Sequence, residues 1–407
     1  MTLIQFLGGC REVGRSAVLI ENLVLDYGIK PKDPPEFPVS SKFPKYAIIS
    51  HAHLDHVGAC PILTVSDTEF YMTPITMEIS HVLLKDSMKL TGYVSYTPRD
   101  LVMFETRTKF AEIDETFELD GWLITFMNSG HIPGSVSIHL SGKLNILYTS
   151  DIKLQDTRLM TRADISYPEI DVAIIESTYF GVKHPDRKKL EKAFVESIKE
   201  TIENGGYAII PAFAVARTHE VLMILNKYKI RAYVDGLGLE IAKIFERYPE
   251  YLRDLKELKK ALKRAIPVKR GKREEILKEP SVIVTTAGML NGGPALFYIS
   301  RLYEDEKSKI LLTGYQIEGT NGDLALKQKM IRLGSKTVKL KMAVEQYDFS
   351  AHADDEQLKK VAKKCADRGA EIIFTVHGEN TEDFAKWIKE EIGVESYAPR
   401  NGETFVI

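Results

Sequence analysis

The chain has 407 residues, of which 44% are hydrophobic, and a formal net charge of −2 at pH 7. This length exceeds that of one ordinary core, so we expect two structural units, and the composition excludes a disordered or fibrous chain. The near-zero charge provides no global attraction to nucleic acid, so such a partner would have to be held by a local patch.

The cysteines and the N-terminus bear on where the protein works. Cys10, Cys60 and Cys365 are scattered and include no C-x-x-C pair, which indicates thiols in a reducing compartment and not a disulfide framework. The first residues lack a basic segment and reach Gly8-Gly9 too soon for a signal peptide. No apolar run is long enough to span a bilayer. We therefore expect a cytoplasmic protein without a membrane partner.

The first 179 residues alternate short apolar runs with turn residues, which predicts a sheet-rich unit. It also includes a proline-rich loop from Pro31 to Pro44 and a helix from about Thr76 to Lys89. The predicted strands are Leu3–Leu7, Ala17–Ile20, Leu23–Asp26, Tyr46–Ile49, Trp122–Met127, Ser137–Leu140 and Asn145–Tyr148.

After Phe180 predicted helices and strands alternate, which indicates a parallel sheet flanked by helices. The order is helix Pro185–Asn204, strand Tyr207–Phe213, helix Ala216–Tyr228, strand Ala232–Asp235, one long helical region Leu239–Ala265, strand Ser281–Thr286, helix Pro294–Tyr303 and strand Lys309–Thr313. The C-terminal part repeats the alternation with helix Asp354–Arg368, strand Glu371–Val376 and helix Asp383–Ile392.

A group of metal-binding residue types follows the strand Tyr46–Ile49. His51, His53, Asp55 and His56 lie within six residues, and imidazoles combined with a carboxylate suit zinc. The two-residue spacing directs His51 and His53 to one side, whereas Asp55 and His56 lie on the following turn, placed to bind a second ion. The alternative is a polar loop with ordinary hydrogen-bonded histidines, which is improbable for this pattern directly after an apolar strand.

A two-metal site needs more ligands than these four. His131, Asp151 and His377 each follow the C-terminal end of a predicted strand, where ligand sites on sheets tend to form. Each alone would more often be a capping aspartate or a structural histidine. Their shared position favours metal binding.

These residues carry a resemblance to a known family that extends over almost the whole chain. Ser50–His56, with Asp26, His131 and Asp151, resembles the signature of the metallo-β-lactamase superfamily. Further stretches resemble the motifs of its β-CASP branch, which acts on nucleic acids: Glu176–Tyr179, Pro211–Thr218, Asp348–His352 and Val376–Gly378. Glu12–Ser16 and Thr285–Leu290 look most like the pre-mRNA 3′-end cleavage endonuclease (cleavage and polyadenylation specificity factor) and its archaeal relatives. Many of those relatives carry N-terminal KH domains, and we expect none here because the first strand begins at residue 3.

The resemblance implies an α/β fold, a metallo-β-lactamase αββα sandwich with an inserted β-CASP α/β domain whose parallel sheet is flanked by helices. Residues 1–179 and 346–407 would form the sandwich, and residues 180–345 the insertion. The resemblance also implies two Zn²⁺ ions. It assigns one ion to His51, His53 and His131, the other to Asp55, His56 and His377, and a bridging position to Asp151.

Asp26 ends an apolar strand, and we assign it the role of holding the geometry of the metal ligands. A simple strand-end cap is an equally good interpretation.

The candidate general acid is His352, in a loop before a predicted helix. Departure of an alkoxide from phosphorus is helped by a proton donor, and histidine suits this near neutral pH. Glu176 ends the strand Val172–Ile175 and could accept a hydrogen bond from the imidazole, which would raise its pKa. The resemblance places this pair beside the leaving group, so we count His352, Glu176 and Asp151 as catalytic. Without His352, a buried structural carboxylate would be the better interpretation of Glu176.

Candidate phosphate contacts lie in the predicted insertion. Thr286 and Gly288 follow one strand and Gly314 follows another, so that backbone N–H groups and hydroxyls there could bind phosphate without reading sequence. Ordinary turn chemistry explains them equally well. Arg217 is a further candidate. The segment Leu255–Arg273 carries nine Lys and Arg residues against one acid, and we favour a solvated helix face over an RNA-attracting stripe.

The leading hypothesis is a zinc-dependent ribonuclease that hydrolyses single-stranded RNA, endonucleolytically, in 3′-end processing or turnover. A 5′-to-3′ exoribonuclease of the RNase J type is the close alternative. A hydrolase of small esters or thioesters would not explain the insertion or the His352 motif. A catalytically inactive scaffold would have lost metal ligands, and all seven are present. The expected partner is single-stranded RNA, and assembly as a homodimer remains open.

Overall fold

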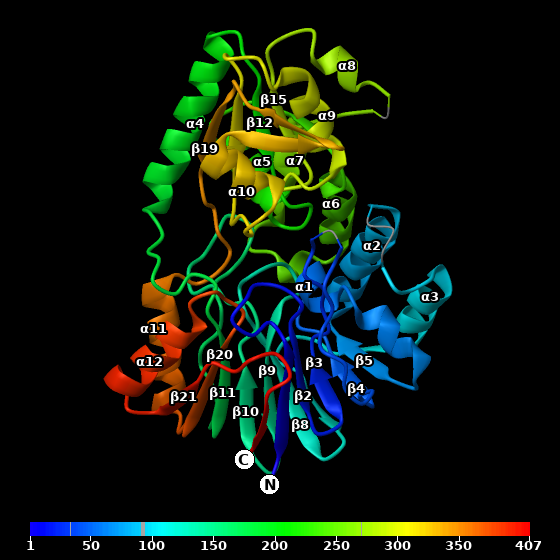
Figure 1. Cartoon of the computed structure of the whole chain (residues 1–407), viewed down its shortest axis with the longest axis vertical. Helices are drawn as coiled ribbons and strands as arrows, with labels where there is room; N and C mark the ends of the chain where they lie inside the picture. Colours follow the sequence, from blue (N-terminus) through cyan, green and yellow to red (C-terminus); the bar gives the residue numbers. More distant parts are fainter. Residues whose placement is uncertain (33, 91–93, 270) are drawn as a thin grey trace. The chain divides into compact units, whose positions relative to one another are not determined.

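The computed structural model in Figure 1 describes residues 1–32, 34–90, 94–269 and 271–407. The chain forms two compact units. Unit 1 comprises Met1–Asp156, Thr161–Lys183 and Ala351–Ile407, and unit 2 comprises Thr157–Met160 and His184–Ser350. The predicted family boundaries after residues 179 and 345 stay a prediction.

Unit 1 is built on two sheets, each of seven strands in the described part of the chain. The first contains β1 (Leu3–Gly8), β2 (Ala17–Ile20), β3 (Leu23–Leu25), β4 (Tyr46–Ile48), β5 (Glu69–Met72), β6 (Thr108–Phe110) and β22 (Thr404–Val406). The second contains β7 (Thr116–Leu119), β8 (Trp122–Asn128), β9 (Val136–Ser141), β10 (Asn145–Tyr148), β11 (Val172–Glu176), β20 (Ile372–Val376) and β21 (Glu395–Tyr397). The strand orders are β22-β1-β2-β3-β4-β5-β6 and β21-β20-β11-β10-β9-β8-β7.

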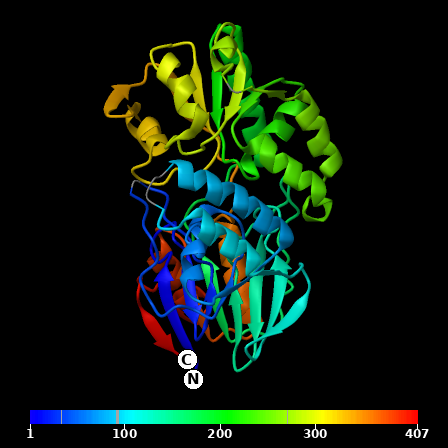
Figure 2. The same ribbon diagram turned by 90° about the vertical axis from the view of Figure 1, so that its right-hand side faces the viewer.

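The two sheets face each other across one core, and each carries helices on its outer face. In β11, Val172 and Ile174 pack between the sheets, whereas Ala173 and Ile175 pack outward against helices, as the two-residue period of a strand requires. The outer helices of the second sheet are α11 (Asp355–Asp367) and α12 (Thr381–Glu391). Those of the first are α1 (Leu54–Val57), the 3₁₀ helix η1 (Cys60–Val65), α2 (Pro74–Leu90) and α3 (Pro98–Thr106), and α2 and α3 face the viewer in blue to cyan in Figure 2. This is the predicted αββα sandwich.

Unit 2 contains an all-parallel sheet in the order β14-β13-β15-β12-β16-β19. Its strands are β12 (Ala208–Pro211), β13 (Tyr233–Asp235), β14 (Ile266–Pro267), β15 (Val282–Thr285), β16 (Lys309–Leu312) and β19 (Ala343–Gln346), and a separate hairpin joins β17 (Met330–Leu333) to β18 (Lys336–Lys339). Its helices, seen on both sides of the sheet in Figure 2, are α4 (Arg187–Glu203), α5 (Arg217–Lys227), α6 (Gly238–Arg247), η2 (Pro249–Tyr251), α7 (Leu255–Arg264), α8 (Arg273–Ile276), α9 (Gly293–Leu302) and α10 (Asn321–Gln328). The predicted parallel sheet flanked by helices is confirmed.

The predicted helical region Leu239–Ala265 is helical over most of its length but is divided into α6, η2 and α7. Pro249 cannot continue a helix, since its ring clashes with the preceding turn and it has no N–H to donate. Asp254 then starts α7 by accepting a hydrogen bond from the Glu257 backbone N–H at 3.0 Å.

The segment Thr157–Met160 belongs to unit 2 although its sequence neighbours belong to unit 1. Glu220 of α5 accepts hydrogen bonds from the backbone N–H groups of Arg158 and Leu159, at 3.0 and 2.9 Å. The Arg158 guanidinium lies 2.9 and 2.6 Å from the two carboxylate oxygens of the buried Glu191 in α4. A short strap of the chain is thereby anchored to two helices.

Two predictions about the chain as a whole can be compared directly with the structure. Among residues 1–32, 34–90, 94–269 and 271–407, no helix combines the length and apolar character needed to cross a bilayer. Cys10, Cys60 and Cys365 are buried free thiols, as expected.

Candidate metal centre

The candidate ligands meet because the strands that precede them are parallel neighbours. β10, β11 and β20 lie side by side and run in the same direction, and Glu176 is directly opposite Val376. Asp151, Glu176 and His377 therefore emerge at the same edge of the second sheet. β4 of the first sheet leads to His51.

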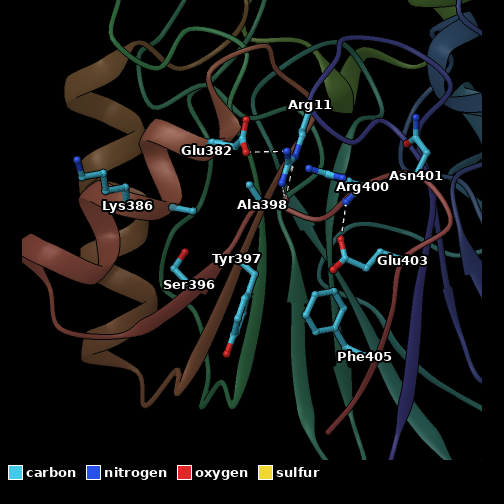
Figure 3. Close-up of a pocket in the computed structure, with 11 residues that line it drawn as sticks. Arg11, Glu382, Lys386, Ser396, Tyr397, Ala398, Arg400, Asn401, Glu403 and Phe405 are labelled. Atoms are coloured by element: carbon cyan, nitrogen blue, oxygen red, sulfur yellow. Dashed lines mark hydrogen bonds and ion pairs between the residues drawn. The ribbon is translucent and has the colours of Figure 1, made fainter.

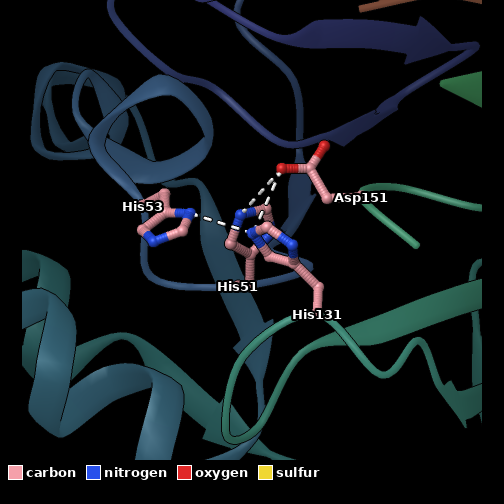
Figure 4. A group of neighbouring side chains, drawn as sticks. All are labelled: His51, His53, His131 and Asp151. Carbon is pink, nitrogen blue, oxygen red and sulfur yellow. Dashed lines mark hydrogen bonds and ion pairs between the residues drawn. The ribbon is translucent and has the colours of Figure 1, made fainter. Parts of the chain in front are cut away.

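One cluster, drawn in Figure 4, contains His51, His53, His131 and Asp151, with one potential ligand atom of each within 4.8 Å of the others. Asp151 Oδ2 lies 3.4 Å from Nε2 of His51 and 3.4 Å from Nε2 of His131. His53 Nδ1 lies 3.1 Å from His131 Nε2. This set contains the three histidines that the family resemblance assigns to the first ion, together with Asp151.

A second cluster contains Asp55, His56 and His377. His377 Nε2 lies 3.2 Å from Asp55 Oδ2, and His56 Nε2 lies 3.9 Å from the same oxygen. The other carboxylate oxygen of Asp151, Oδ1, lies 3.4 Å from His56 Nε2 and 3.5 Å from His377 Nδ1. Asp151 therefore presents one oxygen to each cluster.

His352 and Glu176 lie beside these clusters. His352 Nδ1 is 3.1 Å from each Glu176 oxygen, and His352 Nε2 is 3.9 Å from Asp151 Oδ2. Lys153 Nζ donates a hydrogen bond to the His352 carbonyl oxygen at 2.7 Å, which fixes the backbone of the loop. Burial disfavours the imidazolium, but Glu176 and Asp151 outweigh it and raise the pKa of His352 to about 9.

Hydrogen bonds from Nδ1 orient several of the histidines. His56 Nδ1 lies 2.7 Å from Asp26 Oδ2, and His131 Nδ1 lies 3.0 Å from the Ala351 carbonyl oxygen. Both partners only accept hydrogen bonds, so Nδ1 of each ring carries a proton, and Nε2 is the nitrogen left to face a metal. The sequence interpretation missed Ala351, because a backbone carbonyl leaves no mark in the sequence.

Hydroxyl groups complete this support. His51 Nδ1 lies 3.0 Å from Ser50 Oγ, which in turn accepts a hydrogen bond from Ser150 Oγ at 2.6 Å. His377 Nδ1 lies 3.0 Å from Thr178 Oγ1. Each of these hydroxyls lies next to or two residues from a predicted site residue, and that adjacency is the signal that could have identified them.

Asp26 contacts more than a strand-end cap would. Its fully buried carboxylate accepts hydrogen bonds from the Ser50 N–H at 2.7 Å, the Ser50 hydroxyl at 2.8 Å and the Tyr148 hydroxyl at 2.9 Å, besides facing His56. Its φ of 59° ends β3 and turns the backbone. The capping interaction and the contact with His56 are both present.

The donor atoms fit a metal ion. Among the described residues, His51 Nε2, His56 Nε2 and Asp151 Oδ1 are buried without a hydrogen-bond partner, and such atoms are costly to bury unless a ligand satisfies them. Neutral imidazole nitrogen and carboxylate oxygen are common zinc ligands. These residues can therefore hold a metal cofactor.

Burial and the charges of neighbouring groups control the protonation of the ligands. Burial, with His51 close by, lowers the pKa of His53 to about 3, so this ring is neutral and able to bind metal. Burial raises the pKa of Asp151, but the imidazoles of His377 and His56 outweigh it and hold that pKa well below its usual range. Asp151 is therefore ionised.

Three of the four predicted phosphate contacts meet around Phe213 in unit 2. A Cβ atom added to Gly288 would lie 3.0 Å from Phe213 N, and one added to Gly314 would lie 3.4 Å from Phe213 Cε2 and 3.9 Å from Arg217 Nε. Gln316 Nε2 donates to the carbonyl oxygens of both glycines, at 3.3 and 3.1 Å. A side chain at Gly288 would press on the Phe213 backbone, whereas one at Gly314 would make ordinary contacts.

Thr286 directly follows β15. A Cβ added to Gly236 would meet its hydroxyl, and one added to Gly293 would meet its carbonyl oxygen. Thr286 is therefore packed closely against the backbone at Gly236 and Gly293.

Comparison with known proteins agrees with this architecture. Residues 218–324 match a family described as the Beta-Casp domain, and residues 337–399 match the "Zn-dependent metallo-hydrolase RNA specificity domain". A solved structure of a protein of unknown function from Enterococcus faecalis is 15% identical with a TM-score of 0.64 and covers the whole of both chains, which shows a shared fold.

Similar curated proteins extend over nearly the whole sequence. "Probable RNase MJ4" of Methanocaldococcus jannaschii is 37% identical over 98% of this chain and 99% of its own length. "RNase aCSPSF2" of Saccharolobus solfataricus is 38% identical over 98% of this chain and 84% of its own length. The "Transcription termination factor FttA" of Pyrococcus horikoshii is 34% identical over 98% of this chain and 70% of its own length. With this similarity and both family matches, the chain belongs to the metallo-β-lactamase superfamily and, within it, to the β-CASP branch.

Proposed function

We propose that the protein is a two-zinc ribonuclease that hydrolyses phosphodiester bonds of single-stranded RNA endonucleolytically, in 3′-end processing or turnover. The observation that carries the proposal is the position of Asp151, whose two carboxylate oxygens face two separate ligand clusters. Relatives named as ribonucleases support the choice of RNA.

In this proposal His51, His53 and His131 hold one zinc ion, Asp55, His56 and His377 hold the other, and Asp151 bridges them. Two bound zinc ions would supply Lewis acidity that activates water at neutral pH and polarises the phosphodiester. Asp26, Ser50 and Thr178 hold the imidazole rings in the orientation for binding.

The remaining chemistry is a proton transfer by the chain's own residues. Water loses one proton to the solvent, and its oxygen forms a bond to phosphorus as the bond from phosphorus to the leaving oxygen breaks. His352 donates its proton to that leaving oxygen, and Glu176 stabilises and orients the imidazolium before the transfer. The two oxygens of Glu176, each 3.1 Å from His352 Nδ1, favour the protonated imidazole that a general acid requires.

The phosphate contacts are part of the same proposal. Gly288 and Gly314 allow close approach of backbone N–H groups, and Arg217 beside Gly314 adds a positive charge. Thr286 would contribute a hydroxyl to a neighbouring phosphate. Such contacts position RNA without reading its sequence.

An "RNase J-like protein" of M. jannaschii, 36% identical over 99% of this chain and of its own length, favours a 5′-to-3′ exoribonuclease as the second candidate. One experiment distinguishes the two. The zinc-loaded protein is incubated with RNAs labelled at either end, each with a free 5′-monophosphate or a blocked 5′ end, and products are mapped at nucleotide resolution. Internal cuts in blocked RNA support the endonuclease. Mononucleotides released only from the free 5′ end support the exonuclease, and intact RNA after zinc loading rejects both.

The proposal places the enzyme in the cytoplasm. Whether it works as a homodimer is decided by the solution mass of the zinc-loaded protein.

A further inference from the structure

A cavity of about 660 Å³ lies in unit 1 between the edges of the two sheets (Figure 3). Its walls come from β21, from the turn that leads into β22, from the start of α12, and from Arg11. β21 and β22 are the edge strands of their sheets, so the cavity occupies the open side of the sandwich. Its lining combines aromatic rings with charged side chains, and the proposed hydrolysis uses none of them.

An aromatic platform forms one wall. The Tyr397 side chain, in a residue that is 42% exposed, packs with its ring centroid 5.4 Å from that of Phe405 and 5.9 Å from that of Phe374. Phe374 is fully buried, so the core supports the exposed ring from behind. A supported, exposed aromatic ring is the kind of surface on which nucleobases stack.

Charged side chains of both signs line the same cavity: Arg11, Lys386 and Arg400 with Glu382 and Glu403. Arg11 is held in place by Glu382 at 2.6 Å and by the Ala398 carbonyl oxygen at 2.9 Å. Lys386 approaches Glu390 only at 3.9 Å, with both side chains largely exposed, and the Arg400 residue is exposed as well. The exposed ion pair between Lys386 and Glu390 contributes little to stability. Lys386 and the exposed Arg400 can therefore turn toward an anion at little cost in free energy.

The cavity is joined to the metal-ligand loop by hydrogen bonds. The His377 N–H donates to the Gly9 carbonyl oxygen at 2.6 Å, and the Cys10 N–H donates to Asn401 Oδ1 at 3.1 Å. Arg11 is two residues from Gly9, a step of at most about 7 Å. Arg11 also has a φ of 57°, a conformation that non-glycine residues adopt rarely, as often happens at functional positions. The segment Gly9–Arg11 thus contacts the candidate ligand His377 at one end and lines the cavity at the other.

We propose that this cavity binds one nucleotide of the RNA outside the metal centre, with the base stacked on Tyr397 and the phosphate held by Lys386 and Arg400. This proposal rests on the proposed ribonuclease function, because it takes RNA as the substrate. The family match described as an RNA specificity domain, residues 337–399, includes Lys386 and Tyr397. The binding would be sequence-tolerant, since every base has a face that can stack.

The test measures affinity for a fluorescent single-stranded RNA by anisotropy, with zinc-loaded full-length protein in a His352→Ala background that slows cleavage during titration. Tyr397→Ala should weaken binding by roughly 5- to 100-fold, whereas Tyr397→Phe keeps the ring and should restore it. Phe110→Ala is the matched control, because Phe110 is 56% exposed on β6, at the opposite edge of the first sheet.

Arg400→Ala and Lys386→Ala keep the test decisive if Tyr397→Ala does not fold. Both should weaken binding and flatten its salt dependence, relative to the exposed control Lys143→Ala. RNA carrying photoreactive 4-thiouridine should crosslink to the peptide that contains Tyr397.

Affinities equal to those of the controls, or crosslinks only to other peptides, would overturn the assignment of the cavity. That result leaves the ribonuclease proposal intact if wild-type protein cleaves RNA. Failure of wild-type protein to cleave RNA would instead reject the ribonuclease proposal.

Discussion

His352 Nδ1 is placed symmetrically between the two carboxylate oxygens of Glu176, 3.1 Å from each. Glu176 is buried, and Oε1 also accepts a hydrogen bond from the Ile152 N–H at 2.9 Å. A carboxylate held this rigidly fixes the ring of its partner, so that Nε2 of His352 points away from Glu176. The pair has the arrangement of a general acid and its orienting group.

His352→Ala should retain both metals and RNA affinity and lose about 10²- to 10⁴-fold in cleavage rate, because the leaving oxygen departs without a proton. Glu176→Gln should give a smaller loss, since the imidazole remains but the supporting charge is removed. Single-turnover rates and metal analysis of the same preparations measure both effects. Since Asp151, Glu176 and His352 could together hold a metal, loss of zinc from His352→Ala would show that His352 is a ligand.

An RNA with a sulfur leaving atom at the cleavage site provides an independent check. Sulfur departs with little need of a proton, so this substrate should recover much of the rate that His352→Ala loses. It should not rescue Asp151→Asn, where the bridging carboxylate is changed. Equal rates of the oxygen and sulfur substrates in His352→Ala would argue against the acid role.

Metal analysis of protein purified without chelator should find about two zinc ions per chain, because seven donors divide into two sets that share Asp151. Exhaustive chelation should remove activity and lower the melting temperature, because the buried donor atoms lose their ligands. Added Zn²⁺ should restore both. A stoichiometry near zero, with no recovery of activity, contradicts the two-zinc proposal.

Asp55→Ala should abolish cleavage while leaving the fold intact, since the Asp55 side chain in the one-turn helix α1 faces His377 at 3.2 Å and is not part of the hydrophobic core. Circular dichroism checks the fold, and the metal content should fall toward one ion per chain. Glu69→Ala is a suitable control, because Glu69 is a half-exposed carboxylate that pairs with Lys109 at 2.9 Å and is not among the candidate ligands. Normal metal content together with most of the activity would show that the ligands are divided differently between the two ions.

The ion pair that anchors the strap Thr157–Met160, between Arg158 and Glu191, should make the free energy of unfolding pH-dependent. Burial raises the pKa of Glu191, but Arg158 and Lys227 outweigh it and leave that pKa below its ordinary value. The ionised carboxylate thus adds stability above the unfolded pKa, near 4.3, and this contribution is lost as the pH falls through the folded pKa. Glu191→Gln should cost about 1–3 kcal/mol at pH 7 and progressively less below about pH 4.

Thermal unfolding at a series of pH values measures this difference. Glu196→Gln is the control on the same helix, because Glu196 is exposed and its ion pair with Lys192 is 3.8 Å long. A destabilisation by Glu191→Gln that stays constant from pH 7 to pH 3 would assign the effect to packing instead of charge.

Substitutions in the basic helix α7 test whether its charged face is only solvated, as we favour, or contacts RNA. Lys259 and Lys263 are exposed, whereas Arg264 donates to the Asn226 side-chain oxygen at 3.1 Å and therefore has a structural contact. If α7 contacts RNA, the double substitution of Lys259 and Lys263 with Gln should flatten the salt dependence of binding by roughly 0.7 per lost phosphate contact. An affinity at low salt that matches wild type and the control Lys336→Gln would confirm the solvated-face interpretation.

The local part of the site was predictable from sequence. His51, His53, Asp55 and His56 lie in one short motif after β4, so their proximity follows from the chain itself. His377 was placed beside them only through the family resemblance, because 322 residues separate it from Asp55. Spacing alone cannot show which distant strand becomes the neighbour of another.

Other features depended on contacts that residue patterns do not show. The strands with alternating apolar residues, such as β8, were predicted within a residue or two, whereas β21 and β22 are short, largely exposed and were missed. The strap Thr157–Met160 has no periodicity, and its attachment depends on Glu220 and Glu191, which lie on helices predicted for amphipathicity alone.

The separation between Asp55 and His377 also imposes an order on biosynthesis. A ribosome releases the N-terminal histidine motif long before it adds the residues that complete the second ligand cluster. Unit 2 is continuous in sequence apart from the strap Thr157–Met160. It can therefore fold while unit 1 still lacks β20, α11 and α12. A nascent or truncated chain that ends before His377 cannot make the contact with Asp55, so the centre is completed only when synthesis is nearly finished. The metal centre of the ribonuclease therefore stays incomplete while most of the chain is being translated from its own mRNA.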